Sequence, residues 1–167
     1  MSKHPRHGQQ QGGGVRAGGQ SRPRDHGRQG SRQQSVEVLF DPEASPTELV
    51  DSLAERQAGQ LQINSAQLRR FFGEIKDLYR RYNALAAADA GAKDHIYHEQ
   101  IEPMFKMIRS KVSYATHPGG QRQLPKEFAE FLKQGIARVR TAEQFQRFVL
   151  HVEAVVGFMY GKGKVSR

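Results

Sequence analysis

The stretch His98–Glu102 contains the residue types that can bind a metal ion. It reads H-E-x-x-E, one residue away from the H-E-x-x-H helix of zinc proteases. A histidine and a carboxylate four residues apart share one face of a helix, so His98 and Glu102 have the spacing of two ligands, but no third ligand is evident. We therefore expect a solvated helix face here, with no metal, no cofactor and no catalytic residue.

A second group of side chains could bind phosphate. At 100° per residue, Arg69, Lys76 and Arg80 fall with Gly73 and Asn83 within an arc of roughly 80° on a helix. Positive side chains in such a stripe can contact a polyanion, although a charged stripe is also the usual appearance of a solvated helix face. The three cations share one face only if the helix continues unbroken past Gly73.

The helix expected to carry this stripe spans residues 64–88, and the rest of the chain is organised around it. Asn64 or Ser65 caps its start. Its apolar side chains have the i, i+3, i+4, i+7 spacing of one buried helical face; they are Leu68, Phe71, Phe72, Ile75, Leu78, Tyr79, Tyr82 and Leu85.

Four further helices are predicted by caps and periodicity. Ser45 begins a short helix that ends near Gln57, and residues 94–115 form another, in which Pro103 marks either a kink or the true first turn. Pro125 opens a helix that runs to about residue 137, and Thr141 caps the last one, which is apolar on nearly all sides. The fold class expected is therefore all-α, a bundle of four to five helices over residues 45–161.

The N-terminal 40 residues are expected to form a disordered basic tail. Residues 1–35 consist mainly of Gly, Gln, Arg, Ser and His, which cannot bury enough apolar surface to offset the entropy of ordering. Seven basic residues against one acidic residue give this part a net charge of +6, which leaves +3 of the total of +9 for the remainder. The tail is equally consistent with diffuse RNA affinity and with a solubilising extension. Residues 36–40 are apolar enough to dock onto a neighbouring surface or to form a brief strand.

The composition excludes several classes of protein. The chain contains no cysteine, so disulfides and thiolate metal sites are excluded, and a reducing cytoplasmic location is expected. No apolar run approaches the length of a membrane span, and no nucleotide-binding or hydrolase motif is present. We therefore expect a protein that is not an enzyme, with nucleic acid as the leading class of partner.

Three motifs, taken in order, resemble a known family. They are INSAQLRRFFGEI at residues 63–75, MIRSKVSYA at 107–115 and FQRFVLHVEAVVGF at 145–158. Together they are similar to the small subunit of the type III-A CRISPR effector, the Csm complex, over about residues 61–160. Two departures are a longer loop, HPGGQ, before Arg122, and Gly157-Phe158 where an alanine and a tyrosine are more usual.

The resemblance implies a non-catalytic helical bundle that acts in antiviral defence. Such subunits stack in several copies along the repeated backbone subunit, beside the large subunit and neighbouring copies of themselves, and line the channel for crRNA and target RNA. RNA cleavage belongs to other subunits. The resemblance also implies that Arg69, Lys111 and Arg122 match basic positions of the family. Including the stripe, the expected RNA-binding residues are Arg69, Lys76, Arg80, Lys111 and Arg122.

The alternative is a protein-interaction adaptor whose basic face only aids solubility. In that hypothesis the second apolar face of the last helix, formed by Leu150, Ala154 and Phe158, binds the partner.

Overall fold

The computed structural model describes residues 36–119 and 123–167. Residues 1–35, which make up most of the expected tail, and Arg122 lie outside the described residues. The described residues belong to one compact unit, which begins at residue 34.

Helix α3 spans Ser65–Ala88 and is unbroken. The side chain of Asn64 accepts hydrogen bonds from the backbone N–H groups of Ala66 and Gln67, which satisfies two of the free donors at the helix start. The apolar stripe predicted from the sequence is turned into the core, and Leu68, Phe71 and Ile75 are almost fully buried. Gly73 does not interrupt the helix, so the condition for a continuous basic stripe is met.

The third predicted helix is divided in the structure. A 3-10 turn, η1 (Ala90–Ala92), leads into α4 (Lys93–Ile96), a π-helical turn η2 (Tyr97–Ile101) and α5 (Glu102–Ala115). Pro103 lies in the first turn of α5, where its missing N–H has no helical partner to lose. Of the two alternatives left open for Pro103, a kink or the true first turn, the structure shows the second, and the wide π turn directly precedes it.

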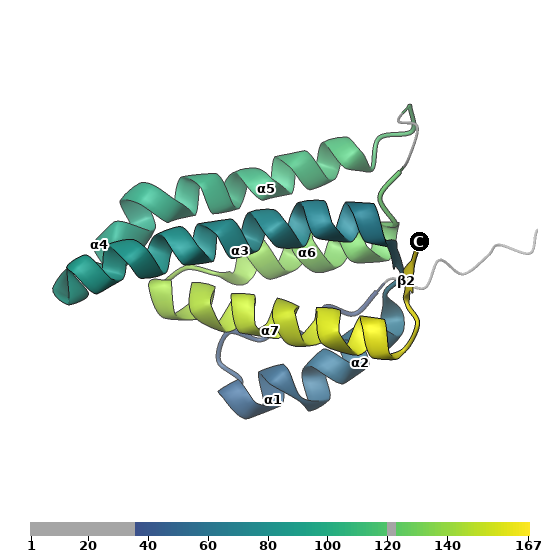
Figure 1. Ribbon diagram of the computed structural model, residues 1–167, viewed down its shortest axis with the longest axis horizontal. Helices are drawn as coiled ribbons and strands as arrows, with labels where there is room; N and C mark the ends of the chain where they lie inside the picture. Colours follow the sequence, from purple (N-terminus) through teal and green to yellow (C-terminus); the bar gives the residue numbers. More distant parts are fainter. Residues whose placement is uncertain (1–35, 120–122) are drawn as a thin grey trace, which may run out of the picture. The chain divides into compact units, whose positions relative to one another are not determined.

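Helix α7 (Ala142–Gly161) is the centre of the bundle, which explains why it is apolar on nearly all sides. One side packs against α3, where the rings of Tyr79 and Phe145 lie 6.2 Å apart. Its other side is covered by the short helices α1 (Pro46–Val50) and α2 (Ser52–Gln60), which are separated at Asp51. Helix α6 (Lys126–Arg138) packs against α5. In Figure 1, α5, α3 and α7 lie side by side, with α6 behind them.

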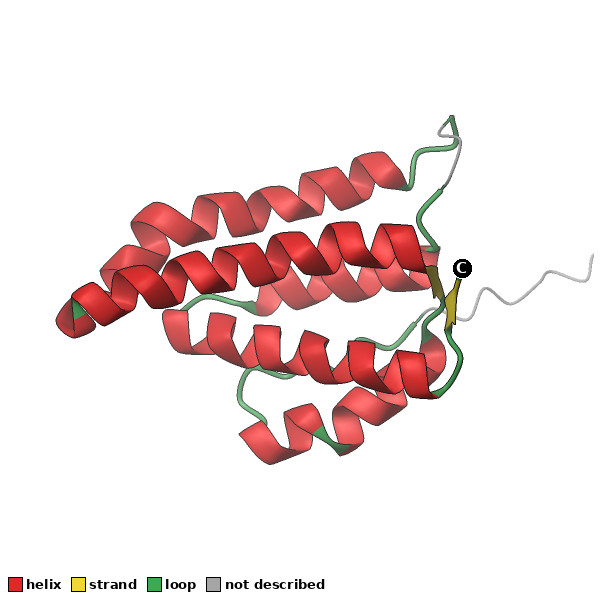
Figure 2. Ribbon diagram, viewed as in Figure 1, coloured by secondary structure: helices red, strands yellow, loops and turns green. Residues whose placement is uncertain are grey.

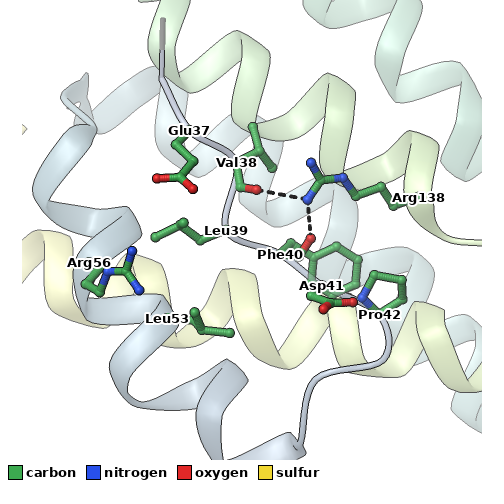
Figure 3. A pocket seen from close by; sticks show the side chains of 9 residues that line it. All are labelled: Glu37, Val38, Leu39, Phe40, Asp41, Pro42, Leu53, Arg56 and Arg138. Carbon is green, nitrogen blue, oxygen red and sulfur yellow. Dashed lines mark hydrogen bonds between the residues drawn. The ribbon is translucent and has the colours of Figure 1, made fainter. Parts of the chain in front are cut away.

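Residues 36–40 dock onto the folded part, which is one of the two alternatives expected for this apolar patch, although the tail was expected to extend to residue 40. Phe40 is fully buried, and its ring packs edge-on against Phe148 at 5.0 Å. The segment is extended and makes backbone hydrogen bonds to side chains on both sides. Leu39 N–H donates to Gln57 Oε1 at 2.7 Å, while Arg138 Nη1 donates to the carbonyls of Val38 and Phe40 (Figure 3).

Two short strands join distant parts of the chain. β1 (Ile63–Asn64) pairs in parallel with β2 (Val165–Ser166), so the residues after α7 lie beside the start of α3. Apart from this pair, the described residues contain only helices and loops (Figure 2), and the predicted all-α class is confirmed. Among the described residues, no helix is long and apolar enough to cross a membrane.

Candidate nucleic-acid interface

The basic stripe predicted on α3 lies on one exposed face of the helix, but two of its three cations are ion-paired. Lys76 Nζ lies 2.9 Å from Glu153 Oε2 on α7, and Arg80 pairs with Asp77 on α3 itself. Arg69 is exposed and makes no ion pair with any described residue. Of the three, Arg69 is therefore the one whose positive charge is not offset by a neighbouring carboxylate.

The predicted residues outside α3 differ in their surroundings. Lys111 on α5 pairs with Glu74 on α3, so its ammonium group joins the two helices. Lys106, one turn earlier, is half-buried and donates to Ile136 O at 2.9 Å and to Val139 O, which satisfies carbonyls at the end of α6. Burial lowers the pKa of Lys106. These two lysines hold helices together, and both are partly exposed, Lys111 more than Lys106.

Four cations without an ion pair gather at one end of the bundle. They are Arg69 and Arg70 on α3, Lys126 on α6 and Lys164 just before β2, and none of them pairs with a described carboxylate. We call this group the basic end. The strand pair sets Lys164 beside the start of α3, and a hydrogen bond of 3.2 Å from Gln67 Nε2 to Gln123 O brings the start of α6 to the same place.

Only Arg69 of the basic end was predicted from the sequence. Arg70 lies outside the 80° arc, and its guanidinium carbon lies 5.5 Å from the ring centroid of Phe71. Lys126 and Lys164 are distant in sequence from α3, and the two-residue strand that positions Lys164 has no periodic signal. A search for cations without carboxylate neighbours in sequence would have indicated Lys164, whose nearest carboxylate in sequence is Glu153, but not Lys126, which is followed directly by Glu127.

The histidine and carboxylate of the H-E-x-x-E stretch form a pair with each other. His98 Nδ1 lies 2.6 Å from Glu102 Oε2, and Lys106 Nζ lies 3.7 Å from the other oxygen of the same carboxylate. In the part of the chain that the structure describes, no group of three or more His, Asp or Glu side chains is placed to hold a metal ion. The arrangement is a surface network of polar side chains in which the Glu102 carboxylate contacts both His98 and Lys106.

Two hollows in the surface lie away from the basic end. One, of about 540 Å3, is lined by the extended segment 37–42 together with Leu53, Arg56 and Arg138 (Figure 3). Because Arg138 is bound to two backbone carbonyls, it holds this segment in place. The other, of about 290 Å3, lies between α3 and α5, and its apolar lining residues are Leu78, Met104 and Met107. Neither contains an arrangement of nucleophile and base.

Comparison with known proteins identifies a family. No curated protein and no solved structure matches this chain. The model of the family described as Csm2 Type III-A matches residues 44–162, which is more than half of the chain and includes every described helix from α1 to α7. The chain therefore belongs to the Csm2 type III-A family, and it is a small subunit of a type III-A CRISPR complex that associates with other Csm subunits.

Proposed function

We propose that this chain is a non-catalytic, RNA-contacting structural subunit that lines the crRNA and target RNA channel of the complex in several copies. The observation that carries the proposal is the basic end, where four cations lie together without described acidic partners. An ion-paired lysine must give up its carboxylate before it can bind a phosphate, whereas an unpaired arginine has no such cost. Arg69 and Arg70 are therefore the principal contacts.

Contacts of this kind are made to the RNA backbone. Guanidinium and ammonium groups bind phosphate oxygens and release counterions, which gives affinity without reading the base sequence. Sequence recognition then comes from pairing between the guide and the target, as in other RNA-guided complexes. Lys76, Arg80 and Lys111 are secondary contacts in this proposal, and Arg122 remains a prediction outside the described residues.

The test removes equal charge from the two ends of the bundle. Lys93 and Arg140 lie at the far end, where Ala142 N–H donates to Asp94 Oδ1 at 3.2 Å, and neither makes an ion pair with a described residue. The double variant Arg69→Ala/Arg70→Ala is expected to weaken RNA binding and to flatten its salt dependence by about two units of slope, one for each phosphate contact. Lys93→Ala/Arg140→Ala is the matched control.

Two results would contradict the proposal. One is unchanged RNA affinity in the Arg69→Ala/Arg70→Ala variant. The other is an equal loss in both double variants, which would indicate attraction by net charge alone. A variant lacking residues 1–35 is measured in parallel, because a basic tail by itself binds RNA weakly.

The second candidate, a protein-interaction adaptor, is favoured by a different surface from the one predicted. Of the face formed by Leu150, Ala154 and Phe158, only Leu150 is exposed, while the other two pack against the core. Met104 and Met107 beside the α3–α5 hollow are 45% and 56% exposed, and exposed methionines are typical of protein contacts. Loss of co-purifying Csm subunits from a Met104→Ser/Met107→Ser variant, with RNA affinity intact, would support the adaptor.

A further inference from the structure

Two tyrosines are exposed near the basic end. Tyr114, in the last turn of α5, is 84% exposed, and Tyr160, in the last turn of α7, is 54% exposed. No ring contact or hydrogen bond with a described residue holds either side chain. A tyrosine ring this exposed contributes little to the core. Whether it can contact a ligand together with Arg69 and Arg70 depends on its position relative to them.

An ion pair fixes the register of α3 against α7. Lys76 contacts Glu153, and Tyr79 contacts Phe145 further along, so residue numbers rise on one helix as they fall on the other and the helices are antiparallel. Arg69 lies seven residues before Lys76, and Tyr160 lies seven residues after Glu153. At a rise of about 1.5 Å per residue, both are about 10 Å from the ion pair, toward the same end. Arg69 and Tyr160 are therefore level with each other.

A second ion pair fixes the register of α3 against α5 in the same way. Glu74 contacts Lys111, and Arg81 Nη1 lies 3.4 Å from the sulfur of Met104, so these two helices are also antiparallel. Tyr114 is three residues beyond Lys111, which places it level with residue 71 of α3, next to Arg70. Because Arg70 lies 100° around the helix from Arg69, it is on the side of α5, and Arg69 is on the side of α7.

The four side chains thus form one row across three neighbouring helices, in the order Tyr114, Arg70, Arg69, Tyr160. We call this row the tyrosine–arginine band. With helix axes about 8–10 Å apart, its two tyrosines are separated by about 16–20 Å. Figure 1 shows the three helices side by side, with the end of α5, the start of α3 and the end of α7 at the same end of the bundle. Gly157, one turn before Tyr160, has no atom within 4 Å of an added Cβ, so the surface beside the ring is open.

We infer that the tyrosine–arginine band binds unpaired RNA, with Tyr114 and Tyr160 each stacking on a base and Arg69 and Arg70 holding the phosphates between them. The inference rests on the proposed function and adds the kind of RNA that the surface takes. Bases in a duplex are stacked on one another and offer an aromatic side chain no free face, whereas unpaired bases stack readily on tyrosine. Surfaces that bind single strands combine positive charge along the backbone with aromatic rings on which the bases stack, and this row contains both.

The experiment separates stacking from charge with three RNA probes of equal length. An unstructured repeat of cytidine and adenosine carries both phosphates and bases, its abasic equivalent carries phosphates only, and a blunt duplex carries bases that are already stacked. Tyr114→Ala and Tyr160→Ala in the full chain are each expected to weaken binding of the repeat about five-fold or more. Binding of the abasic and duplex probes, and the salt slope, should stay unchanged. Phe at both positions should preserve affinity, because it keeps the ring.

The outcomes distinguish this inference from the proposed function. If the tyrosine variants bind all probes as the unaltered chain does while Arg69→Ala/Arg70→Ala binds weakly, the inference fails and the proposed function stands. If neither set of variants changes RNA binding, both fail. Loss of assembly with other subunits, with affinity for the repeat intact, would assign the tyrosines to a protein contact and overturn the inference. Both tyrosines are exposed, so thermal unfolding should be unchanged in every variant.

Discussion

Glu153 on α7 holds Lys76 on α3, with 2.9 Å between the carboxylate Oε2 and the ammonium Nζ. The pair joins α3 and α7, two of the three helices that carry the tyrosine–arginine band. It also offsets a positive charge that the sequence alone assigns to RNA. The same contact thus fixes how α3 and α7 are aligned along their axes, and it lowers the contribution of Lys76 to RNA affinity.

Replacing Glu153 by Gln is therefore expected to strengthen RNA binding. The substitution frees the ammonium of Lys76 for a phosphate, and the salt dependence should steepen by up to about one unit of slope. Because both side chains are partly exposed, stability should change by no more than about 1 kcal/mol. Fluorescence anisotropy over a salt series measures the slope.

The matched control for this change is Glu143→Gln. Glu143 pairs with Arg147 near the start of α7, and Arg147 also donates to the carbonyls of Pro42 and Ala44, so its guanidinium stays in place. The control alters net charge equally but releases no cation near the basic end. An equal gain in affinity in both variants would refute a specific role for Lys76.

Stability is expected to fall in mild acid because of His151. This side chain is fully buried, its Nδ1 lies 2.7 Å from Leu49 O, and burial lowers its pKa below the ordinary value of 6.5. Well above pH 6.5 the imidazole is neutral in both folded and unfolded chains and adds no pH dependence. Below pH 6.5 the unfolded chain takes up the proton first, so the free energy of unfolding decreases until the lower pKa of the folded state is reached.

Urea unfolding from about pH 8 to about pH 5 measures this effect. A His151→Leu variant keeps an apolar side chain at the site and should lose most of the slope below pH 6.5. Replacing the exposed His95 by Leu is the control and should keep it. A slope that persists in the His151→Leu variant would show that other groups cause it.

Two glycine-to-alanine substitutions should have opposite effects on stability. A Cβ added at Gly135 would lie 2.5 Å from Phe148 Cε2, in the packed contact between α6 and α7, so Gly135→Ala should destabilise the fold by about 1–3 kcal/mol. At Gly157, a Cβ meets nothing within 4 Å, and alanine favours a helix by up to about 1 kcal/mol over glycine. Chemical denaturation measures both, and destabilisation by Gly157→Ala would contradict the open surface found there.

Removing the guanidinium of Arg138 should loosen the N-terminal segment. Arg138→Ala deletes the hydrogen bonds to the carbonyls of Val38 and Phe40, and hydrogen bonds from a charged donor are worth about 1.5–3 kcal/mol. Hydrogen exchange should show faster exchange of the Leu39 amide, which is bound to Gln57. Arg109→Ala removes an exposed arginine that makes no ion pair with a described residue, and it should leave this amide protected.

The helices could be predicted from sequence wherever the deciding interactions are local. The caps at Ser45, Asn64 and Thr141 all accept the backbone hydrogen bonds that their residue types predict. The apolar periodicity of α3 was predicted from an equally short window, while for Pro103 the sequence left a kink and a first turn as the two alternatives. These features depend on residues within about one helical turn of each other.

The features that could not be predicted depend on residues far apart in sequence. The break at Asp51 between α1 and α2 has no proline or glycine to signal it, and the burial of residues 36–40 follows from side chains on α2, α6 and α7. The ion pairs of Lys76 and Lys111 join different helices. A helical wheel shows on which face of its own helix each lysine lies, but it does not show that a carboxylate from another helix pairs with it. The basic end likewise exists only after the chain has folded.

The segment that Arg138 and Arg147 hold has a consequence for synthesis. Its hydrogen bonds join residues about a hundred positions apart, from Val38 to Arg138 and from Pro42 to Arg147. A nascent chain leaves the ribosome N-terminus first, so the side chain of Phe40 stays exposed to solvent until α6 and α7 have been synthesised and have folded. Contacts of such long sequence separation form late and slowly. The last third of the chain thus completes the first part of the domain, and a ribosome that stalls before α7 exposes the apolar segment to aggregation.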